Sequence, residues 1–456
     1  MELNSLTFIM LFLPMFIGSM LLFKNAKHQK IIILLFSMIF YFYNDIYYFG
    51  LLIAVILTTY CFALLMNGTN KKTFYFIYLI LIVGLLAFFK YGNYFIDSLE
   101  QYLLFNDSLK ILMPLGISFY IFTSISYVSD CYYGKIEPDH NLINIASYLV
   151  FFPTIVSGPI LRYNNFNNFL DEITVNSNTI AKGFRRFIIG LFKKTIISNQ
   201  LSVVVTAIFD PKTELSFVLA WFGAIAFMLQ LYYDFSSYSD MAIAIAEMIG
   251  LKIPENFNDP YMSLSIQEFW RRWHISLGSW FRDYVYIPLG GSRVSTLRWL
   301  FNTFIVWALT GIWHGSTFGY LLWGLYNGIL LVFNKFVLSK MKMPKIISWA
   351  MTQFMVLFGF LIFRIQSFTQ LKTFISCMLL RREFLDLFYL KSLDIHYTWL
   401  YVIIAIIFIF PFFKKAFYTI EKKNGYIFDL IMILMLFVSL VYIISGSYSS
   451  FIYAGF

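Results

Sequence analysis

Long apolar runs separated by short polar segments make up most of this chain. Three apolar runs (31–44, 73–89 and 397–413) are shorter than a full membrane crossing. Each can still form a membrane span if a flanking charged side chain extends to the interface. The stretch 299–334 is long enough for two crossings or for one broken crossing. Six runs without a charged side chain approach the roughly 20 residues that a membrane helix needs, namely 3–23, 46–70, 111–129, 215–233, 346–363 and 430–456. The pattern predicts an all-α, polytopic integral membrane protein with about ten to twelve membrane helices.

Composition and charge support this class. The chain is 60% hydrophobic and 13% charged, whereas soluble domains carry about 25% charged residues. The net charge of +10 comes from lysines clustered in short loops, as the positive-inside rule describes, and this argues against a nucleic-acid partner. The rule places 24–30, 335–345 and 414–424 inside and both termini outside. Residues 1–23 lack the positive start of a signal peptide, so we expect a retained first span.

We expect one membrane domain over 1–456, with scaffold spans (1–130), a catalytic core (131–334) and C-terminal spans (335–456).

The core is irregular. Residues 148–169 contain Pro153, Gly158 and Pro159, so no straight helix fits. Such a break survives at membrane depth only when it is buried in protein or lines a wet cavity. The stretch 180–194 mixes charged and apolar residues and predicts a helix in the interface plane.

The densest charge cluster lies in residues 265–283, and ionisable groups in a membrane chain are functional candidates. The spacing predicts one amphipathic helix with Trp270, His274, Leu277 and Phe281 on a shared face. On another face Glu268 and Arg272 are four residues apart and can pair. The cluster contains Glu268, Arg271, Arg272, His274, Arg282 and Asp283.

A second histidine, His314, sits in an apolar run between Gly311 and Gly315. Histidine can accept and return a proton near neutral pH, so His314 is a candidate base. The alternative is a histidine that only hydrogen-bonds two helices, and His274 has the similar alternative of simple packing. The two histidines are forty residues apart without nearby Cys, Asp or Glu at ligand spacing. We therefore expect no metal site.

Residues 232–240 carry two more acids, Asp234 and Asp240, at the end of an apolar run. We expect these acids at a membrane boundary, as partners of Arg271, Arg272 or Arg282, and Asp234 is also a candidate for lining the substrate channel. The alternative is an interfacial cap with an aromatic belt.

Several blocks of the chain resemble the membrane-bound O-acyltransferase (MBOAT) family. The resemblance is strongest to its bacterial alginate O-acetyltransferase branch, which includes PatA-like peptidoglycan O-acetyltransferases. The blocks are FFPTIVSGPILRY (151–163), YYDFSSYSDMAIAIAEMIG (232–250), PENFNDPY (254–261), EFWRRWHISLGSWFRDYVYIPLGG (268–291) and WHG (313–315).

The resemblance implies helices around a central funnel, some of them tilted or in-plane. It also implies acyl transfer from a cytoplasmic thioester, acetyl-CoA or another donor, across the bacterial cell membrane toward an extracytoplasmic glycan. A secreted or membrane-anchored SGNH-type transferase would be the partner. No permanently bound cofactor is expected. D-alanyl transfer to teichoic acid, a transporter or flippase, and a recruiting scaffold remain alternatives.

The same resemblance implies roles for individual residues. His314 matches the essential histidine, which we expect to be the base. His274 matches the second active-site position, where it orients that base, polarises the carbonyl or positions the acceptor. Trp273 and Trp313 would exclude water. The arginines Arg271, Arg272 and Arg282 would hold their helix or meet donor phosphates.

Overall fold

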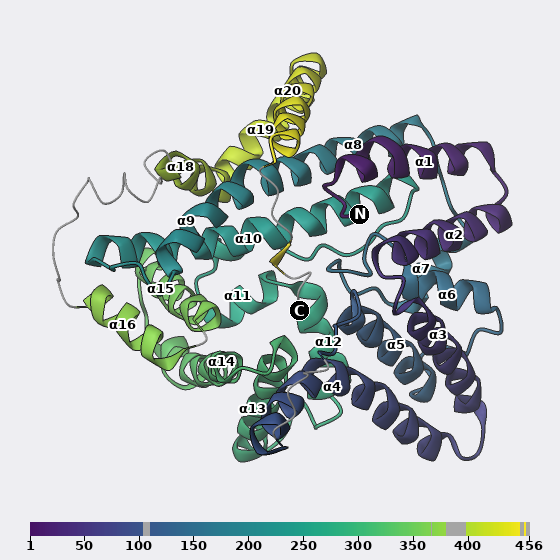
Figure 1. The fold of residues 1–456 in the computed structure, drawn as a ribbon, viewed down its shortest axis with the longest axis horizontal. Helices are drawn as coiled ribbons and strands as arrows, with labels where there is room; N and C mark the ends of the chain where they lie inside the picture. Colours follow the sequence, from purple (N-terminus) through teal and green to yellow (C-terminus); the bar gives the residue numbers. More distant parts are fainter. Residues whose placement is uncertain (104–109, 366, 380–397, 447–450, 453–456) are drawn as a thin grey trace. The chain divides into compact units, whose positions relative to one another are not determined.

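The structure, a computed structural model, describes residues 1–103, 110–365, 367–379, 398–446 and 451–452. In these ranges the chain forms helices and no strand, with one isolated antiparallel bridge between Phe257 and Trp273 (Figure 1). The predicted all-α class is confirmed.

Seven helices in the described ranges are long and apolar enough to cross a membrane, or eight if the bent pair Trp399–Ile409 and Pro411–Lys423 is counted as one span. The chain is therefore a multi-pass membrane protein, while the total of about ten to twelve helices and the central funnel stay predictions. The seven are Phe49–Asn67, Lys71–Asp97, Ser177–Phe209, Phe217–Met248, Phe318–Lys340, Lys345–Arg364 and Gly425–Ile444.

The described residues cluster into two compact units. Unit 1 contains Met1–Phe187 and Ser239–Glu255, and unit 2 contains Ile188–Tyr238 and Asn256–Ile452. The helices that begin in unit 1 are η1 (Phe8–Phe12), α1 (Leu13–Leu22), α2 (Ala26–Asn44), α3 (Phe49–Leu64), η2 (Leu65–Asn67), α4 (Lys71–Leu103), α5 (Ile117–Tyr132), α6 (Leu142–Val150), α7 (Tyr163–Leu170) and α8 (Ser177–Phe192).

Unit 2 contains the segments that carry both candidate histidines. Its helices are η3 (Lys193–Ser198), α9 (Asn199–Phe209), α10 (Phe217–Met248, which ends in unit 1), η4 (Pro260–Met262), α11 (Ile266–Arg272), α12 (Ile275–Phe281), η5 (Arg282–Tyr286), α13 (Thr296–His314), α14 (Phe318–Phe336), η6 (Leu338–Lys340), α15 (Lys345–Arg364), α16 (Phe368–Leu379), α18 (Thr398–Ile409), α19 (Pro411–Lys423) and α20 (Gly425–Ile444).

The predicted break in 148–169 is confirmed. Helix α6 ends at Val150, α7 begins at Tyr163, and the irregular segment between them is buried in unit 1. The backbone N–H of Phe152 donates to Ser37 Oγ at 3.1 Å, and its ring packs against Phe12 at 5.3 Å between centroids. The protein interior thus supplies the hydrogen bonds that a broken backbone cannot find in lipid.

The predicted in-plane helix over 180–194 is wrong as a separate element. Helix α8, the π-helical turn η3 and α9 run on from one another, and Ser177–Phe209 is one of the candidate spans. Within the stretch Lys194 pairs with a buried carboxylate and Arg186 with Asp240, whereas the Lys182 side chain is 73% exposed.

Residues 232–240 lie inside the 32-residue helix α10 and are almost all buried, and the arginine partners predicted for Asp234 and Asp240 are wrong. Their position at a membrane boundary stays a prediction. Asp234 does not meet an arginine. Its Oδ1 accepts from Lys194 Nζ at 2.7 Å and from Ser198 Oγ at 3.0 Å, and its Oδ2 accepts from the Ile452 N–H at 2.7 Å. The Lys194 and Asp234 side chains are only 0% and 2% exposed. Asp234 is thus fully engaged by protein groups.

Replacing Gly116 by alanine should destabilise the protein because its backbone has φ +65° and a Cβ would lie 2.2 Å from the Ile155 carbonyl oxygen. Gly134 is a matched control, since it has φ +69° but open space around the missing Cβ. We expect Gly134→Ala to cost about 1 kcal/mol and Gly116→Ala roughly 2 kcal/mol more. The apparent Tm of the detergent-purified variants measures the difference. Equal shifts would contradict the predicted clash.

Replacing Asp234 by alanine should cost about 3–5 kcal/mol, because the Lys194 ammonium is left buried without its counter-ion. Asp234→Leu combined with Lys194→Met should recover most of the lost apparent Tm, since neither charge then remains. Asp171→Ala is the control: it removes a partner of Lys30 that is 66% exposed and should cost at most about 1 kcal/mol. A double variant no more stable than Asp234→Ala would refute this account.

Candidate functional site

Helix α11 carries the charged cluster and begins at a capping motif. Ser265 Oγ accepts from the Glu268 N–H at 3.2 Å, and Glu268 Oε2 accepts from the Leu264 N–H at 2.8 Å. This arrangement satisfies two backbone donors before and within the first turn. The predicted pair is confirmed as well, because Arg272 Nη2 lies 2.8 Å from Glu268 Oε1.

The single helix predicted over 265–283 is wrong. Helix α11 ends at Arg272, α12 begins at Ile275, and Trp273 and His274 form the break between them. His274 has φ 45° and ψ 54°, a left-handed conformation that is uncommon for a residue other than glycine. The shared face of Trp270 and His274 that helical spacing predicts therefore does not form.

The break is held by the PENFNDPY loop. Phe257 and Trp273 form an antiparallel bridge, in which the Asn258 N–H donates to the Arg272 carbonyl at 3.0 Å. On the other side the Ile275 N–H donates to the Asn256 carbonyl at 3.0 Å. Backbone groups that the helix break exposes are thus paired with the loop.

His274 is 4% exposed. Its Nδ1 lies 3.1 Å from Asn256 Oδ1, and the Phe235 ring packs edge-on at 4.5 Å between centroids. His274 lies outside the candidate spans, and burial lowers the pKa of its imidazole to about 3, because the charged form would lose its water. The imidazole is therefore neutral at physiological pH.

His314 occupies the last residue of α13, next to the start of α14. Gly311 and Gly324 bring the two helices together: a Cβ on Gly311 would lie 2.5 Å from the Tyr320 carbonyl oxygen. A Cβ on Gly324 would lie 2.3 Å from the Trp307 carbonyl oxygen. Helix α13 is continuous, so Gly311 serves close packing and not a kink, and Gly315 ends the helix. The stretch 299–334 is thus two helices.

Aromatic rings enclose His314, which is 4% exposed. The rings of Trp323 and Phe363 stand perpendicular to the imidazole with centroids at 5.0 Å each, and Trp313 lies at 4.6 Å. Trp323 also packs on Trp270 of α11 at 5.7 Å. The histidine is therefore held in apolar surroundings, where water is scarce and polar interactions are strengthened.

The remaining predicted residues divide into buried and exposed groups. Trp273 is buried between Phe269 and Phe360, with centroids at 5.6 and 4.9 Å. Arg272 holds its own helix through Glu268, and Arg282 pairs with its neighbour Asp283 at 2.8 Å. Arg271 is exposed.

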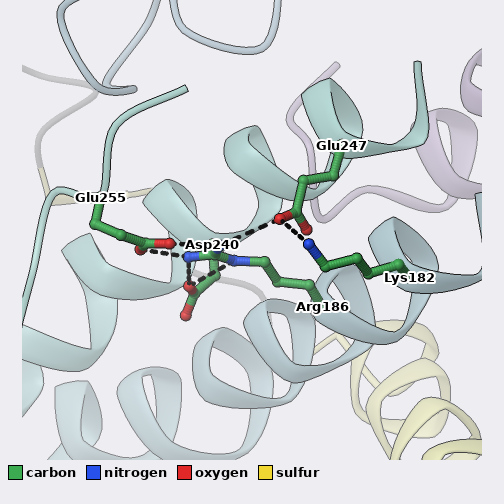
Figure 2. Close-up of polar contacts among 5 residues, drawn as sticks. All are labelled: Lys182, Arg186, Asp240, Glu247 and Glu255. Atoms are coloured by element: carbon green, nitrogen blue, oxygen red, sulfur yellow. Dashed lines mark hydrogen bonds and ion pairs between the residues drawn. The ribbon is translucent and has the colours of Figure 1, made fainter. Parts of the chain in front are cut away.

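Asp240 likewise does not partner these arginines. It belongs to an ionic network in unit 1, where the Arg186 guanidinium lies between Asp240 and Glu255 (Figure 2). Arg186 Nη2 lies 2.9 Å from Asp240 Oδ1 and 2.6 Å from Glu255 Oε2. Glu247 connects Arg186 to Lys182, whose Nζ lies 3.1 Å away from Glu247 Oε1. The network ties α8 to the end of α10 and to the first residues of the PENFNDPY loop.

Asn256 is the residue that sequence reasoning missed, because PENFNDPY predicts only a loop. It is 0% exposed and contacts the break residues His274, Ile275 and Ser276. The position of Asn256 could have identified it. Asn256 is a polar residue between Pro254 and Pro260, within a block that resembles the family. The pairing of Lys194 with Asp234 was missed too, because the two residues lie 40 positions apart and no local spacing connects them.

No group of three His, Cys, Asp or Glu side chains in the described ranges could hold a metal ion. The expectation of a reaction without a metal or a resident cofactor stays a prediction.

The chain matches the model of the membrane-bound O-acyltransferase family over residues 38–379. It is 36% identical to the probable alginate O-acetylase AlgI of Pseudomonas aeruginosa over 384 residues, which cover 80% of this chain and 72% of that protein.

Two further relatives are named for other activities. The chain is 34% identical to the peptidoglycan O-acetyltransferase of Helicobacter pylori over 64% of this chain and 63% of that protein. It is 29% identical to the teichoic acid D-alanyltransferase of Bacillus subtilis over 56% of this chain and 69% of that protein. Both histidines fall within the matched range, and the chain belongs to the membrane-bound O-acyltransferase family and is an acyltransferase.

Proposed function

We propose that this acyltransferase takes an acetyl group from a cytoplasmic thioester, such as acetyl-CoA, and passes it across the cell membrane for O-acetylation of an extracytoplasmic glycan. The acetyl group is favoured because the relatives named for acetyl transfer match more of the chain, at higher identity, than the one named for D-alanyl transfer. The glycan is alginate-like, peptidoglycan or another wall polysaccharide. A secreted or membrane-anchored SGNH-type transferase is the proposed partner on the outer side.

The observation that carries this proposal is the buried His314 imidazole inside its aromatic enclosure. In the proposed step His314 takes the proton of an acceptor hydroxyl while the hydroxyl oxygen attacks the thioester carbonyl. The C–S bond then breaks, and the leaving thiolate receives the proton from the imidazolium. A thioester is already activated, so the step needs no nucleotide.

The aromatic surroundings fit this chemistry. Trp313, Trp323 and Phe363 surround His314 with apolar ring carbons, and such surroundings disfavour water and so limit hydrolysis of the thioester. A transporter would use broken helices and buried charges too. It would not consume a thioester, and this difference makes the two functions separable by experiment.

Replacing His314 by alanine should reduce acetyl transfer by about 10²–10⁴-fold, the range expected for loss of a positioned base. The measurement is ester-linked acetate on purified envelope glycans from a strain that lacks the protein and expresses the variant at wild-type level. His28→Ala is the matched control, since His28 is exposed and belongs to unit 1.

The outcomes separate the alternatives. If wild type and His28→Ala restore acetate and His314→Ala does not, the catalytic role of His314 is supported. The glycan fraction that carries the acetate then identifies the acceptor. Ester-linked D-alanine in place of acetate would identify a D-alanyltransferase. Equal acetate with His314→Ala would favour a transporter or a scaffold.

The lysine clusters also lead us to propose an orientation with both termini outside. Helix α20 follows Lys422 and Lys423 at its cytoplasmic end, so a fusion of alkaline phosphatase after Phe456 should be active. A fusion after Lys340 should be inactive, because that loop is expected inside. The reverse result at either position would refute this orientation.

A further inference from the structure

The contacts of Asn256 fix the tautomer of His274. The Ser276 backbone N–H, which can only donate, points to Asn256 Oδ1 at 3.2 Å, and Ser276 Oγ lies 2.9 Å from the same atom. The amide atom facing Ser276 must therefore be the oxygen and not the nitrogen. His274 Nδ1 lies 3.1 Å from this oxygen and can only bond to it by donating a hydrogen.

A neutral imidazole carries one N–H. If Nδ1 holds the hydrogen, Nε2 keeps a lone pair and can accept but not donate. His274 Nε2 is buried, and it has no hydrogen-bond partner among the described residues. The surrounding rings offer none either: Phe235 packs edge-on against the imidazole and continues into Phe257 at 5.1 Å. A buried acceptor in apolar surroundings needs a donor from outside the described side chains, either a water molecule or a bound ligand that displaces it.

We propose that Asn256 is a positioning residue that holds His274 as the Nδ1–H tautomer, and that His274 Nε2 accepts a hydrogen bond from an N–H or O–H group of a bound substrate. The inference rests on the proposed acyl transfer. It narrows the roles open to His274. A neutral imidazole without a hydrogen on Nε2 cannot polarise the thioester carbonyl, whereas it can position a substrate by accepting a hydrogen bond from it. The donor is an amide N–H of the thioester's arm or a hydroxyl of the acceptor.

The backbone of His274 suggests a selective variant. Asparagine tolerates the left-handed conformation better than other residues with a Cβ, and its side-chain amide can replace Nδ1–H as donor to Asn256. His274→Asn therefore preserves the helix break and the Asn256 contact while it removes Nε2. His274→Gln is its counterpart, because the longer side chain extends a polar atom toward the Nε2 position.

The tautomer can be measured directly, independently of activity. Protein labelled with ¹³C,¹⁵N-histidine in lipid bilayers gives solid-state NMR signals that distinguish a protonated ring nitrogen from one with a lone pair. The signals of His274 are those absent from the His274→Asn spectrum. We expect Nδ1 protonated and Nε2 unprotonated in the wild type, the same in Asn256→Asp, and the Nε2–H tautomer in Asn256→Ala.

Asn302→Ala is the matched control, since Asn302 is a buried asparagine of the same unit that donates to the Gly291 carbonyl. It should leave the His274 signals unchanged. Elution as a single species and wild-type helicity confirm that each variant is folded. An Nε2–H tautomer in the wild type, or an unchanged tautomer in Asn256→Ala, overturns the proposal.

The role of Nε2 is tested by thioester consumption in membranes that hold the complete transfer system. We expect His274→Asn to lower the rate at least 10-fold and His274→Gln to retain more activity. A raised KM for acetyl-CoA assigns the donor arm, and a lowered kcat at saturating acetyl-CoA assigns the acceptor. Wild-type kinetics in His274→Asn overturn the inference. A wild type that consumes no thioester contradicts the proposed function instead, while the NMR result still decides the tautomer.

Discussion

The structure depends on one constraint: where the helices of this membrane protein break, the protein must hydrogen-bond the exposed backbone groups itself. At the α11–α12 break the loop around Asn256 does this by pairing with Arg272 and Ile275. Between α6 and α7, Ser37 does the same for Phe152. The first of these breaks forces His274 into a left-handed conformation and presents it to Asn256. The requirement to satisfy the backbone thereby also positions the side chain of a candidate site residue.

Buried charged side chains likewise need partners from the protein itself, and oppositely charged side chains supply them. Lys194 and Asp234 neutralise each other inside unit 2, and Arg186 is surrounded by the carboxylates of Asp240, Glu247 and Glu255 in unit 1. Removal of one partner from such a pair is costly because the other charge stays buried. These acids and bases thus have structural partners, whereas the two histidines lie mainly among aromatic rings.

Much of the fold and part of the candidate site were predictable from the sequence. Long apolar runs predict membrane helices because a helix satisfies its own backbone hydrogen bonds in lipid. The lone histidine in WHG is a functional candidate because an ionisable group in an apolar run costs free energy. The pair Glu268–Arg272 was predictable from local helical spacing. The errors share a cause. A local pattern takes no account of distant segments, so it merged α11 with α12 and gave Asp234 an arginine partner in place of Lys194.

The sequence by itself determined the all-helical membrane class and the family and identified two histidines as candidates, since these follow from composition, local spacing and short blocks of residues. Only the tertiary structure decided the partners: Lys194 for Asp234, Arg186 for Asp240, and Asn256 for His274. Each of these pairs joins residues 18 to 54 positions apart. The reason is physical: which acid meets which base, and which nitrogen of an imidazole keeps its hydrogen, depends on contacts between distant segments that no local pattern encodes.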